Sequence, residues 1–446
     1  MDIRQLHRLF LGCSAITTDS RAIKGGEMFV ALKGENFDGN DYALKAIEAG
    51  ASYAVVDKTS VAAAEGAVNI IPVEDTLETL QALGRFHREN TFVDGKKLTV
   101  IGLTGTNGKT TTKELIRCVL AKKYSVTATE GNLNNDIGVP LSLLKINSET
   151  QIAVIEMGAN HLDDIARLVK VSEPDYGLIT NVGKAHLLGF GSYDGVKKAK
   201  GQLYDYISSS GTAIFLNADD PVLCEMAEAR KGLRTIEYGV KCDGAEILPS
   251  DVGSPYLRMS LPAGENGSGL LLNTNLVGRY NADNVMAAIA VGRKFGISTA
   301  EAIEAISAYI PANNRSQMMQ TERNTLIIDA YNANPTSMAA ALDNFENISG
   351  GDKAVLLGDM RELGGDSVQE HRNILAKLKA ADINEIFLVG EEFGKAIDID
   401  GSADNISWFI SSDRLAEYLK NNKLENRTIL IKGSRGIMME KTLREL

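Results

Sequence analysis

The sequence predicts an α/β protein of three domains, and three observations lead to this prediction. The chain has 446 residues, enough for about three domains of about 150 residues each. Short apolar runs of strand length alternate with stretches of helical periodicity, as in a mostly parallel sheet with helices on its faces. Glycines or polar residues directly follow many of these runs, and open α/β sheets bind ligands beyond such strand ends.

Residues 1–94 are expected to form a small N-terminal α/β domain. Its expected elements are strands within 26–34 and 52–57 and helices over 42–51 and 75–90. Asp75 and Glu78 have the spacing of a capping box at the start of the last helix. The polar turn residues of 91–98 predict the first domain boundary.

Residues 95–312 are expected to form a central domain built on a mostly parallel sheet. Its strands are expected within 98–105, 152–160, 175–183 and 212–220, and 270–298 adds a strand followed by a helix. The polar stretch 310–317 predicts the second domain boundary.

Residues 313–446 are expected to form a C-terminal, Rossmann-like α/β domain. Its strands are expected within 325–335, 353–363, 385–392 and 427–436. An independent dinucleotide-binding module is not expected, because the stretch LLGDMREL lacks the G-x-G-x-x-G pattern.

Composition narrows the class of partner. A net charge of −11 argues against nucleic acid, which normally requires a basic face, but is compatible with small anions held by local cations and backbone N–H groups. No apolar run approaches the ~20 residues of a membrane helix, and the N-terminal segment shows no convincing signal peptide. Four cysteines form no CxxC pair, which indicates neither a zinc site nor a disulfide framework and favours the cytoplasm.

The stretch VIGLTGTNGKTTTKEL, residues 100–115, is a variant phosphate-binding loop between a strand and a helix. The common pattern is G-x-x-x-x-G-K-[ST], but its first position holds Leu103 and a glycine follows at Gly105. A helix N-terminus offers free N–H groups and positive charge to phosphate. Lys109 can reach the β/γ-phosphates and the Thr110 hydroxyl can ligate Mg²⁺; the alternative is an ordinary glycine-rich turn before a helix.

This loop resembles the ATP loop of the Mur ligase family, the amide ligases of peptidoglycan synthesis. In that family a residue other than glycine at the position of Leu103 is normal. The resemblance implies an ATP site specialised for acyl activation. The loop residues implied to bind ATP are Gly105, Thr106, Asn107, Gly108, Lys109, Thr110 and Thr111. Outside the loop, the resemblance implies that Asn284, Arg315, Asp329 and Tyr331 bind the nucleotide, with the third domain closing over ATP to exclude water. Asn281 lies three residues before Asn284, on the same helix face. Its alternative role is to cap the helix, and this role is compatible with a nucleotide contact by Asn284.

The resemblance also implies two Mg²⁺ ions and a small set of catalytic residues. The metal ligands implied are Thr110, Glu156, His186 and Lys200, and the catalytic set is Lys109, Glu156, His186 and Lys200. In the family the lysine matching Lys200 is carbamoylated by CO₂, which turns a cation into an anionic oxygen ligand. The alternatives are a solvated strand-end carboxylate at Glu156, a structural histidine at His186, and a basic helix face that Lys200 shares with Lys197 and Lys198.

Four stretches are similar to the family member that joins D-alanyl-D-alanine to UDP-N-acetylmuramoyl-tripeptide: 130–144, 327–338, 356–364 and 431–441. Residues 17–42 resemble the UDP-sugar-binding domain of this enzyme. The residues implied to contact substrate are Ser20, Arg21, Asn134, Asn135, Lys432, Ser434 and Arg435. The alternatives are a polar turn at 19–21, a tight turn at 134–135, and a strand-to-helix turn in which Ser434 caps the next helix.

The function implied is an ATP-dependent ligase that acts as a cytoplasmic monomer. The tripeptide carboxylate would attack the ATP γ-phosphate, and the amine of D-alanyl-D-alanine would attack the acyl phosphate. No Ser-His-Asp or Cys-His arrangement suggests a protein nucleophile. The alternatives are another Mur-type ligase, a folylpolyglutamate synthase, or a P-loop ATPase that makes no amide.

Overall fold

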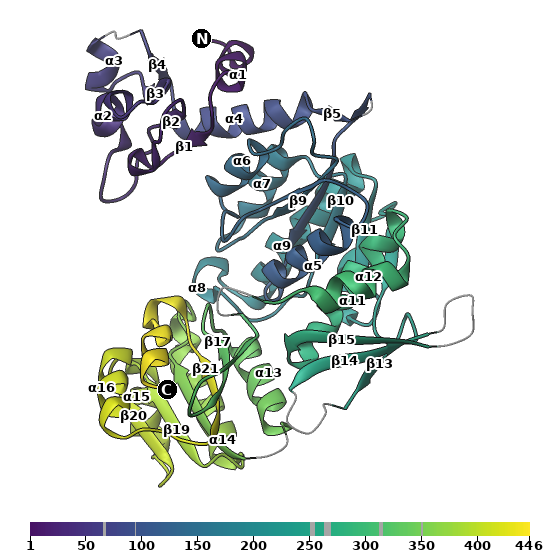
Figure 1. The fold of residues 1–446 in the computed structure, drawn as a ribbon, viewed down its shortest axis with the longest axis vertical. Helices are drawn as coiled ribbons and strands as arrows, with labels where there is room; N and C mark the ends of the chain where they lie inside the picture. Colours follow the sequence, from purple (N-terminus) through teal and green to yellow (C-terminus); the bar gives the residue numbers. More distant parts are fainter. Residues whose placement is uncertain (66–67, 94, 250–254, 263–268, 312–314, 349–350) are drawn as a thin grey trace.

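The structure is a computed structural model, and it describes residues 1–446 except 66–67, 94, 250–254, 263–268, 312–314 and 349–350. Figure 1 shows three units arranged along the chain, with the N-terminus in the first and the C-terminus in the third. The predicted domains end at residues 94 and 312, which lie outside the described residues. No helix in the described part of the chain is long and apolar enough to cross a membrane.

The first unit is a four-stranded parallel sheet with helices around it. In sheet order the strands are β1 (Ile16–Thr17), β2 (Met28–Val30), β3 (Tyr53–Asp57) and β4 (Ile70–Val73), and the helices are α1 (Ile3–Leu11), α2 (Ala43–Glu48), α3 (Val61–Glu65) and α4 (Thr76–Glu89). The two predicted strands and two predicted helices are confirmed. Asp75 caps α4 by accepting the Glu78 N–H at 2.7 Å, whereas a reciprocal capping box stands instead at α1, between Asp2 and Gln5.

The central unit is built on six parallel strands in the order β12-β11-β10-β7-β9-β8. They are β7 (Thr99–Thr104), β8 (Val126–Ala128), β9 (Ile152–Glu156), β10 (Tyr176–Ile179), β11 (Ala213–Asn217) and β12 (Thr235–Tyr238). The helices are α5 (Lys109–Leu120), α6 (Gly138–Leu143), α7 (Asp164–Ser172), α8 (Leu187–Phe190), α9 (Tyr193–Ser210), α10 (Pro221–Glu228), α11 (Ala282–Lys294) and α12 (Thr299–Ala308). A separate antiparallel sheet of β13 (Glu246–Leu248), β14 (Tyr256–Leu261) and β15 (Leu270–Val277) extends this unit.

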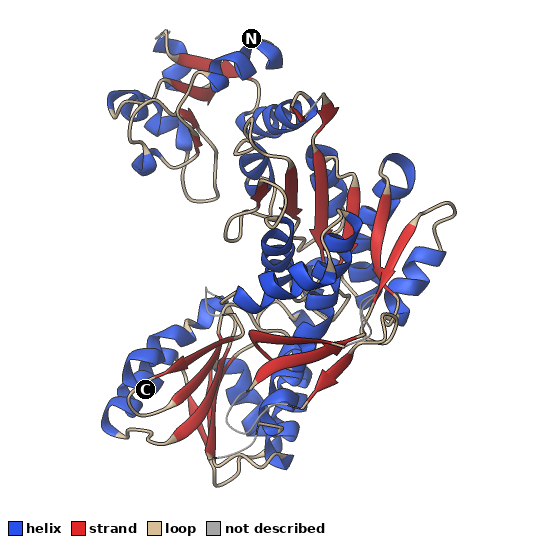
Figure 2. Cartoon of the chain, turned by 45° about the vertical axis from the view of Figure 1, so that its right-hand side comes forward, coloured by secondary structure: helices blue, strands red, loops and turns tan. Residues whose placement is uncertain are grey.

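The third unit is a six-stranded sheet in the order β16-β17-β21-β18-β19-β20, in which only the β16–β17 pair is antiparallel. The strands are β16 (Gln317–Gln320), β17 (Thr325–Asp329), β18 (Asp352–Gly358), β19 (Glu385–Val389), β20 (Ile406–Phe409) and β21 (Arg427–Lys432). The helices are α13 (Pro335–Glu346), α14 (Ser367–Ala380), α15 (Glu391–Asp400) and α16 (Ser412–Asn421). Figure 2 shows helices on both faces of the central and third sheets, as the apolar runs of both units predict.

Helix α4 joins the first unit to the central one. Its apolar face includes Leu80 and Leu83, which share a core with Leu6 and Phe10 of α1 and with Leu144 of the central unit. A two-stranded hairpin of β5 (Phe92–Val93) and β6 (Lys96–Lys97) follows α4 at the predicted boundary. The hydrophobic core is therefore continuous across the first predicted boundary.

Arg88, near the end of α4, fastens the two units with polar contacts. Its guanidinium is 1% exposed and donates to the Glu173 carbonyl at 2.8 Å and to the Asp175 carboxylate at 3.0 Å. The Asp175 carboxylate also accepts the Val100 N–H at 2.8 Å, at the start of β7. Arg85, one turn earlier, makes ion pairs with Glu89 and Glu173 from a side chain that is 50% exposed.

Replacing Arg88 with Met is expected to lower the free energy of unfolding by about 2–4 kcal/mol, because the Glu173 carbonyl loses its guanidinium donor and the Asp175 carboxylate loses its ion pair and keeps only the Val100 N–H among the described residues. Arg85→Ala is the matched control on the same helix and should cost less than about 1 kcal/mol, as exposed ion pairs do. Urea unfolding followed by circular dichroism measures both variants. Equal losses in the two variants would show that Arg88 does not fasten the units.

Candidate active site

The phosphate loop lies between β7 and α5, and two of its glycines have no room for a side chain. Gly105 and Gly108 have φ angles of +149° and +79°, which L side chains avoid. A Cβ at Gly105 would lie 1.9 Å from Thr180 Oγ1, and one at Gly108 would lie 2.5 Å from Asn284 Oδ1. Leu103 is a fully buried residue of β7, so the tight turn comes two residues later than in the common pattern.

The loop is held against the segment that follows β10. The Asn181 side chain accepts the Asn107 N–H at 3.0 Å and donates to the Asn107 carbonyl at 3.0 Å. Thr180 Oγ1 donates to the same carbonyl at 2.6 Å, and the Thr106 N–H donates to the Asn181 carbonyl at 3.0 Å. These bonds set the shape of the loop without a nucleotide.

Lys109 begins α5 and folds back over the loop. Its ammonium donates to the Gly105 carbonyl at 2.8 Å and to the Thr106 carbonyl at 3.1 Å. Burial lowers the pKa of the Lys109 ammonium, Glu156 raises it and Arg315 lowers it. Within the described part of the chain Lys109 forms no ion pair, so its charge is available to a polyphosphate.

Glu156 is a buried carboxylate beside the loop. It ends β9, whose parallel register with β7 places it next to Leu103. Its side chain is among the most buried polar groups, with 1% of the residue exposed. One oxygen accepts the Thr110 hydroxyl at 2.9 Å and the other accepts the Asn134 amide at 2.8 Å. The alternative of a solvated strand-end carboxylate is therefore wrong.

The two predicted asparagines after β8 have different roles. Asn134 reaches Glu156, as described above, whereas the Asn135 side chain accepts the Gly138 N–H at 2.9 Å at the start of α6. Asn135 thus stabilises a tight turn, which was the alternative to a substrate contact for this residue. Thr111 lies beside Thr110 in the first turn of α5, and both are buried.

Lys200 is a buried amine without an anionic partner. It lies on α9, is 2% exposed and forms no ion pair among the described residues. Its Nζ lies 5.8 Å from the centre of the Phe190 ring. Burial lowers the pKa of the Lys200 ammonium well below its ordinary value, Lys109 lowers it further, and Asp164 raises it. The alternative of a solvated basic face is wrong for Lys200, although the neighbouring Lys198 is exposed.

His186 lies just before α8, and the centroids of its ring and the Phe190 ring are 6.4 Å apart. Its Nδ1 contacts the Glu362 carboxylate of the third unit. Burial lowers the pKa of the imidazole, Glu362 raises it, and Lys109 and Lys200 lower it. His186 therefore shares an electrostatic environment with both lysines.

The side chains at this site could hold a hard cation such as Mg²⁺ only if further oxygen ligands came from elsewhere. Thr110 and Glu156 offer a hydroxyl and a carboxylate in direct contact, and such oxygens are what Mg²⁺ prefers. Among the described residues no group of three or more His, Cys, Asp and Glu side chains could hold a metal. Mg²⁺ binding here would therefore depend on ATP phosphate oxygens, on water, or on oxygens added to Lys200.

Asn281 and Asn284 form a chain of amides under the loop. The Asn284 side chain donates to Asn281 Oδ1 at 2.9 Å and accepts the Thr112 hydroxyl at 3.0 Å. Asn281 precedes α11 but makes no capping hydrogen bond with its side chain, which donates to the Val277 carbonyl at 2.9 Å instead. The alternative of helix capping by Asn281 is therefore wrong, because a 3-10 turn, Arg279–Asn281, leads into the helix and the Asn281 side chain is buried.

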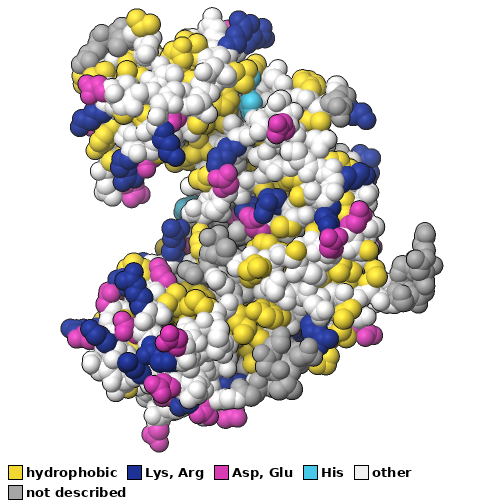
Figure 3. All heavy atoms as spheres, viewed as in Figure 1, with side chains coloured by type: hydrophobic (Ala, Val, Ile, Leu, Met, Phe, Trp, Pro, Cys, Tyr) yellow, Lys and Arg dark blue, Asp and Glu magenta, His cyan; other side chains and the backbone are white. Residues whose placement is uncertain are grey.

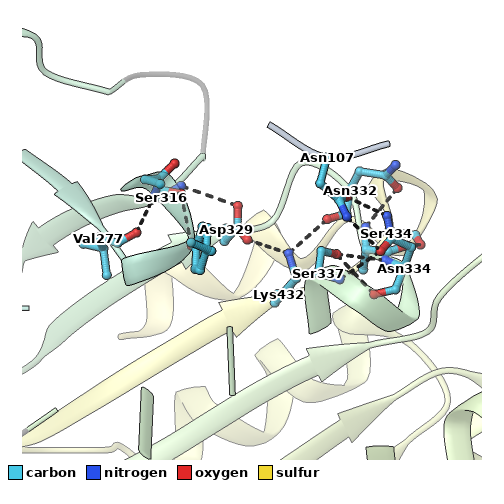
Figure 4. A network of polar contacts seen from close by, with 12 residues as sticks. Asn107, Val277, Ser316, Asp329, Asn332, Asn334, Ser337, Lys432 and Ser434 are labelled. Carbon is cyan, nitrogen blue, oxygen red and sulfur yellow. Dashed lines mark hydrogen bonds and ion pairs between the residues drawn. The ribbon is translucent and has the colours of Figure 1, made fainter. Parts of the chain in front are cut away.

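The third unit brings an aromatic ring and two guanidiniums to the site. The Arg315 guanidinium lies 3.7 Å from the centre of the Tyr331 ring, and that of Arg435 lies 5.6 Å from it. Asp329 and Lys432 end adjacent strands in register and form an ion pair, in which Lys432 is 1% exposed (Figure 4). Asp329 and Lys432 thus join β17 to β21 at the edge that faces the phosphate loop.

Ser434 does not cap the turn that follows β21. Its hydroxyl donates to the Ala333 carbonyl at 3.3 Å and accepts the Arg361 N–H at 2.9 Å. The alternative in which Ser434 caps the next helix is therefore wrong. The loop from β17 to α13 and the loops after β18 and β21 are instead tied to one another.

Ser20 and Arg21 lie in the first unit, in a 3-10 turn that Asp19 caps. The Arg21 guanidinium donates to both Asp19 oxygens, at 2.9 and 2.8 Å, and lowers the pKa of Asp19 to about 2.

A cavity of about 870 Å³ between the first and central units is lined by, among others, Thr17, Thr18, Leu133 and Lys145. Figure 3 shows the molecule hollowed on one side between the first and third units.

Two contacts between the central and third units involve residues not predicted from the sequence. Asn107 of the phosphate loop and Asn334 exchange amide hydrogen bonds, the shorter at 2.8 Å (Figure 4). The Asn334-Pro335 start of α13 is a recognisable helix cap, which could have marked Asn334. Glu362, the partner of His186, stands in a loop with no motif that reveals its role.

Alanine at Gly108 is expected to weaken ADP binding at least about tenfold, roughly 1.4 kcal/mol, because the left-handed backbone and the collision with Asn284 both distort the loop. Gly232→Ala is the control, since Gly232 has a similar φ of +82° but nothing within 4 Å of an added Cβ. Calorimetric titration with ADP compares the two folded variants. Equal affinity in both would contradict this account of the loop.

Family models match the chain in three consecutive segments. The Mur ligase family, catalytic domain, matches residues 13–88; the Mur ligase middle domain matches 103–292; and the Mur ligase, glutamate ligase domain, matches 314–435.

Named relatives match over nearly the whole chain. The UDP-N-acetylmuramoyl-tripeptide–D-alanyl-D-alanine ligases of Escherichia coli and Bacillus subtilis are 34% and 33% identical over 97% of this chain, which covers 93% and 92% of their lengths. The crystal structure of MurF from Acinetobacter baumannii has a TM-score of 0.86 at 31% identity, over 100% of this chain and 98% of that one. That of MurF ligase from Thermotoga maritima in complex with ADP has a TM-score of 0.83 at 25% identity, over 98% and 97%.

Proposed function

The chain belongs to the Mur ligase family, and we propose that it joins D-alanyl-D-alanine to UDP-N-acetylmuramoyl-tripeptide at the expense of ATP. The products are UDP-N-acetylmuramoyl-pentapeptide, ADP and phosphate. The observation that carries this proposal is the identity of 33–34% with ligases of this name over 97% of the chain. The phosphate loop, with its hydrogen-bonded shape and with Lys109 free of ion pairs among the described residues, supplies the ATP site that such a ligase needs.

The reaction begins with activation of a carboxylate, which is a poor acyl donor because oxide is a poor leaving group. The terminal carboxylate of the tripeptide attacks the γ-phosphorus of ATP, the bond to ADP breaks, and an acyl phosphate forms. The Lys109 ammonium and the Arg315 guanidinium neutralise the charge on the phosphates during this transfer. The amine of D-alanyl-D-alanine then attacks the acyl carbon, loses a proton, and releases phosphate as the amide forms.

Nucleotide contacts outside the loop come from two units. Asn284 would face the adenine from α11, while Asp329 and Tyr331 would meet the ribose and nucleotide from the end of β17. The Asn107–Asn334 amide pair supports this arrangement, because it holds the third unit against the loop. A site closed between two units excludes water, which protects an acyl phosphate from hydrolysis.

Two Mg²⁺ ions would complete this site. Thr110 and Glu156 would hold one ion, and His186 with carbamoylated Lys200 would hold the other. When bound, they neutralise phosphate charge during transfer.

Burial of Lys200 supports its carbamoylation. The reaction requires the neutral amine: Nζ attacks the carbon of CO₂, an N–C bond forms and a proton leaves. Lys200 is 2% exposed and forms no ion pair among the described residues, and both burial and the charge of Lys109 lower the pKa of its ammonium, which favours the neutral amine. The carbamate would place a negative charge where the Lys109 ammonium contributes a positive potential.

The substrates would span all three units. Ser20 and Arg21 would contact the uridine diphosphate end, Asn134 and Asn135 the peptide, and Lys432, Ser434 and Arg435 the substrate side of the third unit. Because Lys432 and Ser434 are buried in contacts within the third unit, they would act mainly by shaping the loop that presents Arg435. We also propose that the protein acts as a monomer in the cytoplasm, which four free cysteines support.

Purified protein with ATP, Mg²⁺, UDP-N-acetylmuramoyl-tripeptide and D-alanyl-D-alanine is expected to release phosphate and to form the UDP-pentapeptide in equal amounts. Omission of either substrate should stop both, because the acyl phosphate needs the carboxylate and turnover needs the amine. A phosphate assay and mass spectrometry of the products measure this. Phosphate release without substrates would indicate a simple ATPase, and product from folate with L-glutamate would indicate the other ligase class.

Lys200→Ala is expected to reduce ligase turnover at least about 100-fold, because it removes the oxygen ligand that a carbamate would supply. Lys198→Ala, which removes an exposed amine two residues away, should keep wild-type turnover. The carbamate itself is measured as a ¹³C signal after incubation with labelled bicarbonate. A carbamate signal that persists in folded Lys200→Ala would contradict the assignment to this lysine.

A further inference from the structure

The segment before α8 and the loop after β18 dock the central unit on the third unit. Lys184 Nζ forms an ion pair with Glu370 Oε1 at 2.9 Å, and His186 Nδ1 contacts the Glu362 carboxylate. The Leu188 N–H donates to the Glu362 carbonyl at 3.4 Å, so the backbones also meet. An ion pair and a histidine–carboxylate contact therefore lie in one interface, and only the second involves a predicted metal ligand.

Both partners of the His186–Glu362 contact have strained backbones. Their φ angles are +51° and +66°, in the left-handed region that residues with a Cβ seldom adopt. Strain of this kind persists only where the surrounding structure enforces it, and it is concentrated at functional sites. Its occurrence on both sides of one contact between units indicates that the geometry of this pair is imposed.

The loop that carries Glu362 is anchored from within the third unit. The Met360 N–H donates to Nε2 of His371, a fully buried ring whose Nδ1 donates to the Ser367 carbonyl at 2.7 Å. The Arg361 N–H donates to Ser434 Oγ at 2.9 Å. Both residues before Glu362 are thus held by side chains, so the carboxylate is presented by a rigid loop rather than by a free one.

We propose that Glu362 is a positioning residue that fixes the ring orientation and tautomer of His186 from the third unit. The carboxylate accepts the Nδ1–H, which leaves Nε2 as the nitrogen with a free lone pair. Histidines that bind metals commonly donate their other N–H to a carboxylate in this way, which makes the ligand nitrogen more basic. Because Glu362 belongs to the third unit, His186 is prepared as a ligand only when that unit is docked on the central one.

This inference rests on the proposed function only through the role of His186, so its first test needs no turnover. The chain has five histidines, and ¹⁵N labelling of their rings resolves each tautomer by NMR. His186 is assigned by the signal lost in His186→Gln. In the wild type, His186 is expected as the Nδ1–H tautomer; in Glu362→Ala, its ring nitrogens should shift toward a mixture of tautomers.

Mg²⁺ affinity is the second measurement, by calorimetric titration of the protein saturated with ADP. Glu362→Ala is expected to weaken Mg²⁺ binding about 10- to 100-fold, the usual effect of removing a carboxylate that supports a ligand histidine. Glu362→Gln, which keeps an oxygen acceptor, should recover part of the loss. Glu370→Ala removes the neighbouring ion pair without touching His186 and should leave both the tautomer and the affinity as in the wild type.

Two results would overturn the proposal. One is an unchanged His186 tautomer in folded Glu362→Ala. The other is an equal loss of Mg²⁺ affinity in Glu370→Ala, which would mean that the interface matters only for docking. Failure of the proposed ligase function would be seen separately, as absence of the UDP-pentapeptide from the wild-type protein while the tautomer shift remains.

Discussion

The phosphate loop can serve as an active site because it is fixed against the carboxyl end of β10. Asn181 and Thr180 bond the backbone of the loop, and Gly105 lets the two segments approach more closely than a side chain would allow. Every other part of the site is placed relative to this contact. Glu156 stands on the neighbouring strand, Asn284 lies beneath the loop, and Asn334 reaches the loop from the third unit.

The site gathers positive charge that has few anionic partners among the described residues. Lys109 and Arg315, which form no ion pair there, converge with the buried Lys200 amine and His186, while Glu156 is the buried carboxylate in contact with the loop helix. Taking such cations out of water is costly unless anions join them. A polyphosphate supplies those anions, so the cost of holding these cations away from water favours nucleotide binding. The arrangement thus lowers the folding stability of the protein and raises its affinity for the co-substrate.

The sequence predicted the parts of the site that local rules determine. The phosphate loop and Glu156 follow strand ends of one parallel sheet, and strand ends of such a sheet converge. The strands that were missed, such as β16 and β20, lie at sheet edges, where apolar runs are short. The alternatives in which Asn281 and Ser434 cap helices fail because other partners take up their side chains. Glu362 could not be predicted, since its contact with His186 exists only once two units are docked.

Helix α4 has a consequence for how such proteins can be recombined. Its apolar face belongs to a core shared by two units, and its Arg88 is bonded to the end of α7 and the start of β10. A chimera that took the first unit from another protein, with the join at the end of α4, would carry the α4 side of that interface without the matching surface of the central unit. Successful chimeras would have to inherit the helix together with the surface of the central unit that receives it. The boundary at which a chimera can be joined therefore lies on the N-terminal side of α4, although the domain boundary predicted from the sequence follows this helix.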